Sequence, residues 1–148
     1  MRLPKYQLKS GEQLSSFEFI SEGPNGFIVK RVQFTLLNTK GVYNLAFGDK
    51  DPQSGTLNDL AVSNNGDSEK VLATVAGAVY IFCDNHPGSW IFITGSTQSR
   101  TRLYRMGISK FLEELSLDFA IYGRLNEQWE RFESGKRYTA FLAYRKKS

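Results

Sequence analysis

Hydrophobic and polar residues alternate in the first half of the chain, and a two-residue period is typical of β-strands with one buried face. The clearest case is the segment 27–37, in which Val32, Phe34 and Leu36 alternate with polar residues. The same reading predicts strands at 17–20, 27–37, 42–47 and 57–62. Turn-forming residues separate the first three of them. The pattern therefore predicts a four-stranded antiparallel meander.

The period changes to that of a helix after Asp67. This residue is suited to cap a helix over 68–85, whose apolar face includes Val71, Val75 and Phe82. The opposite side of the same helix is also mostly apolar, which indicates that it is covered on two sides. We therefore expect a second helix, or a second subunit, against its outer face.

The second half of the chain mixes strands and helices. An unbroken apolar run at 90–93 predicts a central strand that is buried on both faces. A helix is predicted at 98–116, and strands are predicted at 118–124 and 137–145, on either side of an irregular segment that contains Trp129 and Phe132.

These elements predict the α+β class. We expect a mostly antiparallel sheet, in which an N-terminal β-meander is followed by the order α-β-α-β-β, with two main helices packed on it in two layers. A length of 148 residues suits a single domain that spans 1–148.

Composition excludes several classes of function. The longest apolar run is too short to span a bilayer and the first residues lack a secretory signal, so we expect a cytoplasmic protein with no membrane partner. The single cysteine, Cys83, and the single histidine, His86, rule out an internal disulfide and make a Cys/His zinc site implausible. No motif requires a cofactor, and none is expected.

The net charge of +4, with a pI near 9.2, favours acidic partners. Part of that excess lies in the run Arg145-Lys146-Lys147, for which a solvated end is the simpler explanation. Charge alone therefore does not identify a nucleic-acid-binding protein.

A candidate anion site follows the 90–93 strand. Gly95, Ser96 and Thr97 form a small polar turn that leads directly into the predicted helix. Backbone N–H groups at the start of a helix attract anions, and the neighbouring hydroxyls add further donors. The turn is not a Walker loop, because the Gly-Lys-Ser/Thr ending of that motif is absent.

Three arginines occupy the first two turns of that helix. A cation there opposes the helix dipole by about 0.3–1 kcal/mol, so Arg100, Arg102 and Arg105 need an anion, an acidic partner or a solvent-facing position. On a helical wheel Arg100 shares the core-facing stripe with Tyr104, whereas Arg102 and Arg105 flank that stripe or face solvent. We therefore expect Arg100 to be the principal ligand residue.

Two interpretations of Arg100 stay open. In the first, it pairs with a carboxylate such as that of Asp59, Asp67 or Asp118 and closes the end of the core. In the second, it acts with the turn at 95–97 to hold a phosphate or another anion.

Asp59 and Asp67 also belong to a polar cluster that would suit acid–base chemistry or a divalent metal. Their spacing matches no EF-hand or other metal loop. Because turns select Asp, Asn and Gly, turn-forming and capping roles are the simpler interpretation.

Other reactive or aromatic side chains give weaker signals. His86 lies in a His-Pro-Gly helix stop, and Cys83 lies late in an apolar helix, where a small core side chain is expected. Trp90 and Trp129 could stack on bases, but an aromatic residue in a strand belongs first of all to the core, and no RNA-recognition signature is present.

Two sequence blocks resemble the signature blocks of a family of small bacterial proteins. They are SNNGDSEKVLATV at 63–75 and GSTQSRTRLYRMGI at 95–108. The resemblance extends over most of the chain, including 43–48 and 138–145. That family is a domain of unknown function, so the resemblance implies no activity and no catalytic residues.

The leading hypothesis is a non-enzymatic binding or interaction protein that recognises a phosphate-containing ligand or nucleic acid through the 95–97 turn and Arg100. A homodimer would fit the apolar helix. The alternative is a small enzyme acting on nucleic acid or a phosphorylated metabolite, including the toxin of a toxin–antitoxin pair. In that case Arg100 would stabilise negative charge and Asp67 or Asp59 would act as base or metal ligand. A third reading is a subunit that docks on an acidic protein partner.

Overall fold

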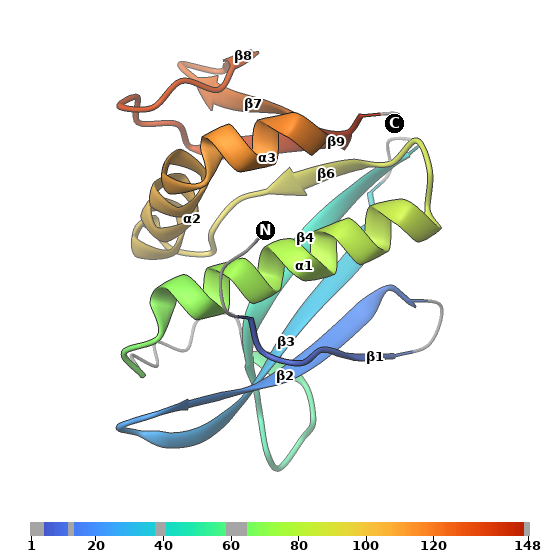
Figure 1. The fold of residues 1–148 in the computed structure, drawn as a ribbon, viewed down its shortest axis with the longest axis vertical. Helices are drawn as coiled ribbons and strands as arrows, with labels where there is room; N and C mark the ends of the chain where they lie inside the picture. The colour runs from blue at the N-terminus through green and yellow to red at the C-terminus, as the bar shows by residue number, and fades with distance from the viewer. Residues whose placement is uncertain (1–4, 12–13, 38–40, 59–64, 147–148) are drawn as a thin grey trace. The chain divides into compact units, whose positions relative to one another are not determined.

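The computed structural model describes residues 5–11, 14–37, 41–58 and 65–146 (Figure 1). Its contacts group the chain into two compact units. The first unit comprises Met1–Thr35 and Ala46–Asn85, and the second comprises Leu36–Leu45 and His86–Ser148.

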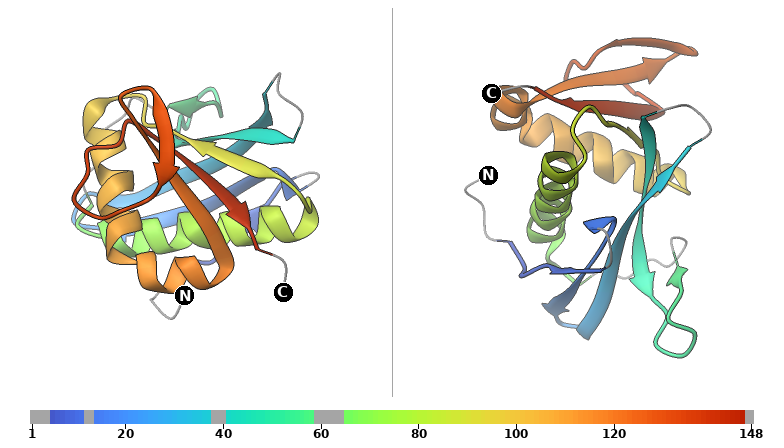
Figure 2. Two further views of the ribbon diagram at one scale, coloured as in Figure 1. Left: turned by 90° about the horizontal axis from the view of Figure 1, so that it is seen from above. Right: turned by 90° about the vertical axis from the view of Figure 1, so that its right-hand side faces the viewer.

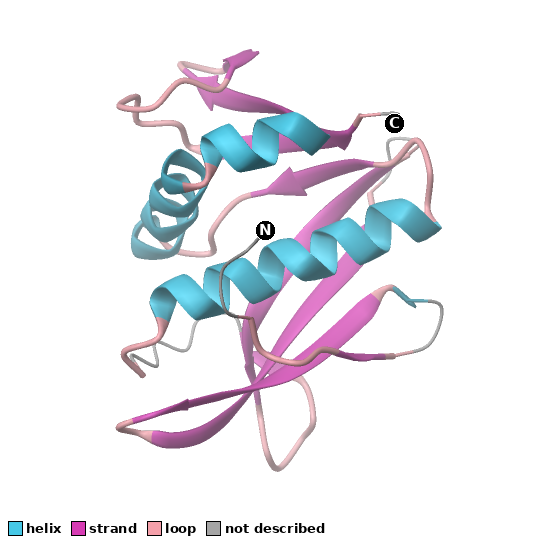
Figure 3. Ribbon diagram, viewed as in Figure 1, coloured by secondary structure: helices cyan, strands magenta, loops and turns pink. Residues whose placement is uncertain are grey.

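The described part of the chain contains three helices and a mostly antiparallel sheet, which confirms the α+β class (Figure 3). The strand order is β1 (Lys9–Ser10), β2 (Ser16–Gly23), β3 (Gly26–Leu36), β4 (Val42–Lys50), β6 (Trp90–Ile93), β9 (Ala140–Arg145), β7 (Phe119–Leu125) and β8 (Gln128–Arg131), with β5 (Leu57–Asn58) paired to β4. The helices are α1 (Ser68–Asn85), α2 (Gln98–Lys110) and α3 (Leu112–Asp118). The strands β4 and β6 are a parallel pair.

The first unit packs α1 on the inner face of β2 and β3. The two strands form an antiparallel hairpin in which Phe17 lies opposite Val32, and both side chains are fully buried. Phe34 continues that face, and its ring stacks on Phe82 of α1 at 4.2 Å between centroids. The period of the sequence therefore predicts both the strands and the helix bounds, because α1 spans the expected residues 68–85.

An extended N-terminal segment lies against another side of α1. The N–H of Tyr6 donates to Thr74 Oγ1 at 2.8 Å, and the ammonium of Lys70 lies 4.1 Å from the centre of the Tyr6 ring. A Cβ placed on Gly77 would meet Lys5 Cδ at 3.6 Å, which is ordinary van der Waals contact. In the first unit, then, a segment without helical structure covers part of the apolar surface for which we expected a second helix or subunit.

Two strand predictions need correction or completion. Leu36, expected on the buried face, is 57% exposed, because it is the last residue of β3. The strand predicted at 57–62 begins as expected with β5 at Leu57, but residues 59–62 lie outside the described part of the chain.

The second unit has one more strand and one more helix than predicted. The helix expected at 98–116 is divided at Phe111, which leaves helical geometry with φ −105° and ψ 14°. The segment expected to be irregular forms β8, which pairs with β7 across a turn at Asn126 and Glu127. Both turn residues have positive φ, of 52° and 64°, and no glycine marks the turn in the sequence.

The strand β6 is central in the strand order, but only part of it is buried. Ile91 is fully buried, whereas Trp90 and Phe92 are half-buried. The prediction of a strand buried on both faces is therefore wrong. An unbroken apolar run does not distinguish a strand covered on both faces from one whose second face keeps large, partly exposed rings.

Tyr138 holds the segment before β9 against the β7–β8 hairpin. Its side chain is fully buried, and its ring lies so close to Gly123 that a Cβ at that position would collide with it. Its hydroxyl donates to Glu130 Oε2 at 2.8 Å and accepts from the N–H of Glu133 at 3.1 Å. Gly123 is therefore required by close packing of an aromatic ring.

We expect Gly123→Ala to lower the free energy of unfolding by about 1–3 kcal/mol, because the added methyl group has no space beneath the Tyr138 ring. The matched control is Gly77→Ala, in which the added methyl group makes only ordinary van der Waals contact and the substitution removes a glycine from a helix interior. That variant should be up to about 1 kcal/mol more stable than the wild type. Urea unfolding monitored by circular dichroism measures both, and equal changes would contradict the packing argument.

Candidate functional site

The turn at 95–97 is built as a helix start with its own internal hydrogen bonds. Thr97 is the N-cap of α2, and its Oγ1 accepts from the N–H of Arg100 at 3.1 Å. The N–H of Gly95 donates to Thr101 Oγ1 at 3.0 Å. Two backbone donors of the candidate anion site are thus already bound to threonine hydroxyls.

Two other donors at this helix start stay available. Within the described residues, the N–H groups of Gln98 and Ser99 have no acceptor, as expected for the first turn of a helix. The side chains around them are exposed, including those of Ser96 and Thr97. The first turn of α2 also contains no acidic residue to complement the dipole.

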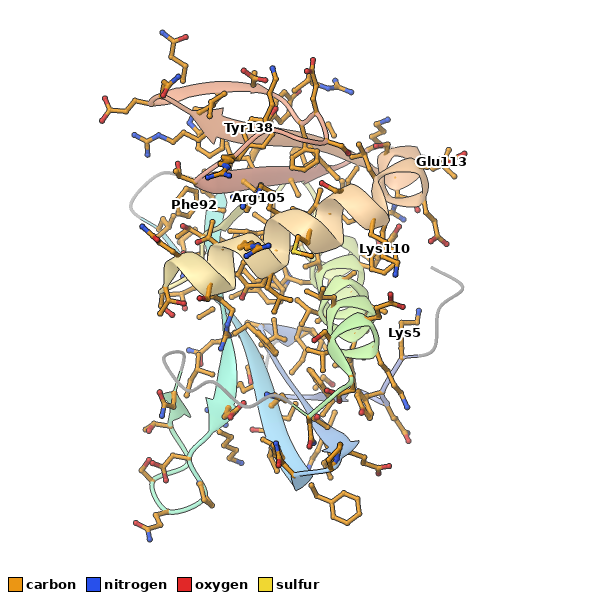
Figure 4. The ribbon with its side chains drawn as sticks, turned by 90° about the vertical axis from the view of Figure 1, so that its left-hand side faces the viewer. Lys5, Phe92, Arg105, Lys110, Glu113 and Tyr138 are labelled. Atoms are coloured by element: carbon orange, nitrogen blue, oxygen red, sulfur yellow. The ribbon has the colours of Figure 1, made fainter. Side chains whose placement is uncertain are left out.

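The three arginines of α2 take different positions. Arg102 is exposed, Arg100 is half-buried, and Tyr104 on the same stripe is buried, as the helical wheel predicts. Arg105 Nη1 donates to the carbonyl oxygen of Tyr138 at 3.3 Å, so this side chain links α2 to the segment before β9 (Figure 4). The three side chains therefore differ in exposure, and Arg105 has a hydrogen-bond partner within the second unit.

Gly95 allows α2 to begin close to the end of β6. A Cβ at this position would collide with the backbone N of Thr101, so no larger residue fits without displacing the helix start. A glycine at position 95 is accordingly explained by close backbone approach.

Positive charge is concentrated in the second unit. This unit has twelve Lys and Arg residues against six Asp and Glu, a formal charge of +6, whereas the first unit has seven against nine, a charge of −2. The excess of +4 in the whole chain therefore comes from the unit that contains the 95–97 turn. An anionic ligand would be attracted to the second unit in particular.

Asp67 belongs to a hydrogen-bond network in the first unit. Its Oδ2 accepts from the hydroxyls of Tyr6 and Ser21, each at 2.6 Å. Its carbonyl oxygen accepts from the N–H of Val71, which places Asp67 directly before α1. Burial and the neighbouring Asp67 carboxylate raise the pKa of Tyr6.

Asn65 extends the same network to the β2–β3 turn. Its side chain is 97% buried; its Nδ2 donates to Ser21 Oγ and to the carbonyl oxygen of Gly26, and its Oδ1 accepts from the N–H of Asn25. A Cβ on Gly23 would collide with the backbone of Asn65. These contacts explain Asn65 and Asp67 as a latch between the hairpin and α1.

The acid–base and metal roles considered for Asp59 and Asp67 gain no support from this arrangement. Asp59 lies outside the described residues, and Asp67 belongs to a different unit from Arg100. No group of three or more His, Cys, Asp or Glu side chains suited to hold a metal ion occurs within the described ranges. Asp118, one of the proposed partners of Arg100, forms an ion pair with Arg145 at 3.1 Å.

A hollow of about 700 Å³ lies in the first unit, between the N-terminal segment and β2. Its charged side chains include Glu18, whose carboxylate binds Arg31 at 2.6 Å and Lys50 at 3.3 Å. Burial raises the pKa of Glu18, but the hydrogen bonds from Arg31 and Lys50 outweigh it and lower the pKa overall. This paired carboxylate has a structural explanation.

The β8–β9 connection contains a second charged network. Glu130 Oε2 accepts from Lys136 Nζ at 2.6 Å and from the Tyr138 hydroxyl. The hydrogen bond from Lys136 and then that from Tyr138 lower the pKa of Glu130, whereas the hydrogen bond to Glu130 raises the pKa of Lys136.

The lone cysteine, Cys83, is buried in α1, as predicted.

The fold and these sites define an α+β protein with a basic second unit. The chain matches, over residues 2–146, the model of a family of unknown function, DUF6934, and it belongs to that family. Neither a curated protein nor a solved structure is similar enough to give a match. In the described part of the chain, no helix has both the length and the apolar character needed to cross a membrane.

We expect Asp67→Ala to lower the free energy of unfolding by about 1–3 kcal/mol, because the buried Ser21 hydroxyl and that of Tyr6 lose their shared acceptor. Chemical denaturation at pH 7 measures the loss. Glu22→Ala is the control, since its exposed carboxylate has no hydrogen-bond partner among the described residues, and a change within about 0.5 kcal/mol is expected. Equal stability of the two variants would refute the latch.

The Glu130 network predicts a dependence on pH. A carboxylate whose pKa is lowered by folding stabilises the protein above its ordinary pKa of 4.5, and this stabilisation disappears as the pH falls through the lower, folded value. Glu130→Gln should therefore lower the melting temperature at pH 7, and the difference from wild type should shrink below pH 4.5. A difference that stays constant between pH 7 and pH 3 would be contrary to this expectation.

Proposed function

We propose that this protein is a non-enzymatic binding module that recognises a phosphate group at the start of α2. The ligand contacts are the turn formed by Gly95, Ser96 and Thr97 together with Arg100, and Arg102 and Arg105 assist from the flanks. The observation that carries the proposal is the pair of N–H groups of residues 98 and 99, which have no acceptor within the described residues, in a unit of charge +6.

The electrostatics of the helix start support an anion. The first turn of an α-helix favours acidic residues, but α2 has none there and carries Arg100 instead. A bound phosphate would place negative charge at this helix start and would accept hydrogen bonds from the backbone and from a guanidinium group together.

We favour binding over catalysis because Asp67, the candidate general base within the described residues, has a structural role instead. Asp67 accepts two hydroxyl hydrogen bonds in the latch of the first unit. No specific observation favours the toxin, the homodimer or the docking subunit over the phosphate-binding module.

Arg100→Ala should abolish binding of a phosphate ligand, and Arg102→Ala should weaken it less, because Arg100 lies on the stripe that also carries the buried Tyr104. Thermal unfolding with inorganic phosphate, nucleotides and short oligonucleotides gives the readout, since a ligand of the native state raises the melting temperature. A ligand at 100 times its Kd stabilises the protein by about 2.7 kcal/mol.

Arg100→Lys is the matched variant, because it keeps the charge and loses the planar fork of the guanidinium group. It should retain part of the shift with phosphate. If no ligand shifts the wild type and Arg100→Ala melts much lower, Arg100 is a structural ion-pair residue. Equal losses in Arg100→Ala and Arg102→Ala, with folding intact, would show that the wheel assignment is wrong.

A further inference from the structure

One face of the sheet in the second unit carries large aromatic side chains. Residues directly opposite each other in neighbouring strands share a face. Trp90 lies opposite Tyr144, Tyr122 lies opposite Arg131, and Trp129 lies opposite Arg124. The strand registers place on this aromatic face Trp90, Phe92, Tyr122, Trp129 and Tyr144.

The aromatic face differs from the other face of the same strands. On the opposite face, Phe119, Ile121 and Phe141 are at most 7% exposed. Helices α2 and α3 lie on that side of β7 and β9, as Figures 1 and 2 show, and Arg105 of α2 binds the segment before β9. On the aromatic face Trp129 is 40% exposed and the other four rings are half-buried.

The rings form two neighbouring groups. Trp90 lies 4.8 Å from Tyr144 and 5.9 Å from Tyr122 between ring centroids, and the rings are tilted by about 40°. Phe92 and Trp129 meet edge to face at 6.3 Å. The rings are held in place by packing against one another, so a ligand that stacks on them binds a preorganised surface.

The charged side chains that β7 and β8 place on this face are arginines. Arg131 lies with its guanidinium carbon 5.6 Å from the centre of the Tyr122 ring, and Arg124 lies opposite Trp129. No Asp or Glu of β6, β7, β8 or β9 shares the face, because Glu130 points to the other side with Gly123. A ligand of this surface therefore combines flat, apolar groups with negative charge.

We propose that the aromatic face binds single-stranded nucleic acid. Exposed bases stack on aromatic rings, and phosphates pair with nearby arginines, which is the chemistry that these side chains provide. In a duplex the bases are stacked inside and cannot stack on these rings. An acidic protein would bind mainly through the arginines, and it would leave the aromatic rings without a role. The proposal goes beyond phosphate binding at the start of α2 and does not depend on it.

Intrinsic fluorescence tests the proposal directly, because both tryptophans of the chain, Trp90 and Trp129, lie on the aromatic face. Titration with an oligothymidylate should quench their emission in a saturable way. An abasic oligomer of the same length, which has the phosphates without the bases, should bind at least about fivefold more weakly. Equal affinity for the two oligomers, or no binding of the thymidylate, would overturn the proposal.

Substitutions at Trp129 and at a control position test whether the oligonucleotide binds to the aromatic face. Anisotropy of a fluorescein-labelled thymidylate should show affinity reduced about fivefold or more in Trp129→Ala, retained in Trp129→Phe, and unchanged in Leu117→Ala. Leu117 is the control because it is 76% exposed and lies in α3, on the other side of β7. Trp129→Phe also guards against loss of folding, since it keeps a ring at this position.

The same titration separates this site from the phosphate site. Arg131→Ala should weaken binding of the thymidylate and reduce its salt dependence. Arg100→Ala should lose the stabilisation by inorganic phosphate while keeping base-dependent quenching. If Arg100→Ala abolishes oligonucleotide binding and Trp129→Ala leaves it unchanged, the helix start alone binds nucleic acid and the aromatic face does not.

Discussion

The two-residue period of the β-strand is the constraint on which both units depend. Every side chain that enters the core places its neighbour on the opposite face of the sheet. In β2 the buried Phe17 and Phe19 leave the intervening Glu18 outside, where it pairs with Arg31. In β6 the same rule buries Ile91 and leaves Trp90 half-exposed. The core and the candidate binding surface of the second unit are therefore two consequences of one alternation.

The segments 63–75 and 95–108 show how conspicuous residues can owe their identity to folding. Asn65 and Asp67 bind the β2–β3 hairpin to the start of α1, and Gly95 permits a close backbone approach at the start of α2. A buried polar group without a hydrogen-bond partner lowers the stability of the fold, so each of these side chains constrains the positions of its hydrogen-bond partners. Within the segment 95–108, the exposed Arg102 is not explained in this way. An exposed residue without a structural role, such as Arg102, is a candidate ligand contact.

The two units differ in charge, and this difference indicates which of them attracts an anionic ligand. In the first unit Asp49 pairs with the buried Lys30 at 2.6 Å, and Glu18 pairs with Arg31 at 2.6 Å. The second unit keeps a surplus of six positive charges, including arginines beside aromatic rings. A basic surface with flat apolar groups attracts ligands that combine phosphate with bases. The helix start and the aromatic face are two ways in which the same unit would meet such a ligand.

The sequence by itself determined the elements whose signal is local. The bounds of α1, the strand at 90–93, the Thr97 helix start and the buried position of Tyr104 follow from periodicity and capping chemistry, which involve only near neighbours. Only the tertiary structure decided the β7–β8 hairpin and which side of β6 was covered. These features depend on pairing and burial between residues distant in the sequence, and a tryptophan in a strand has the same local pattern on either face.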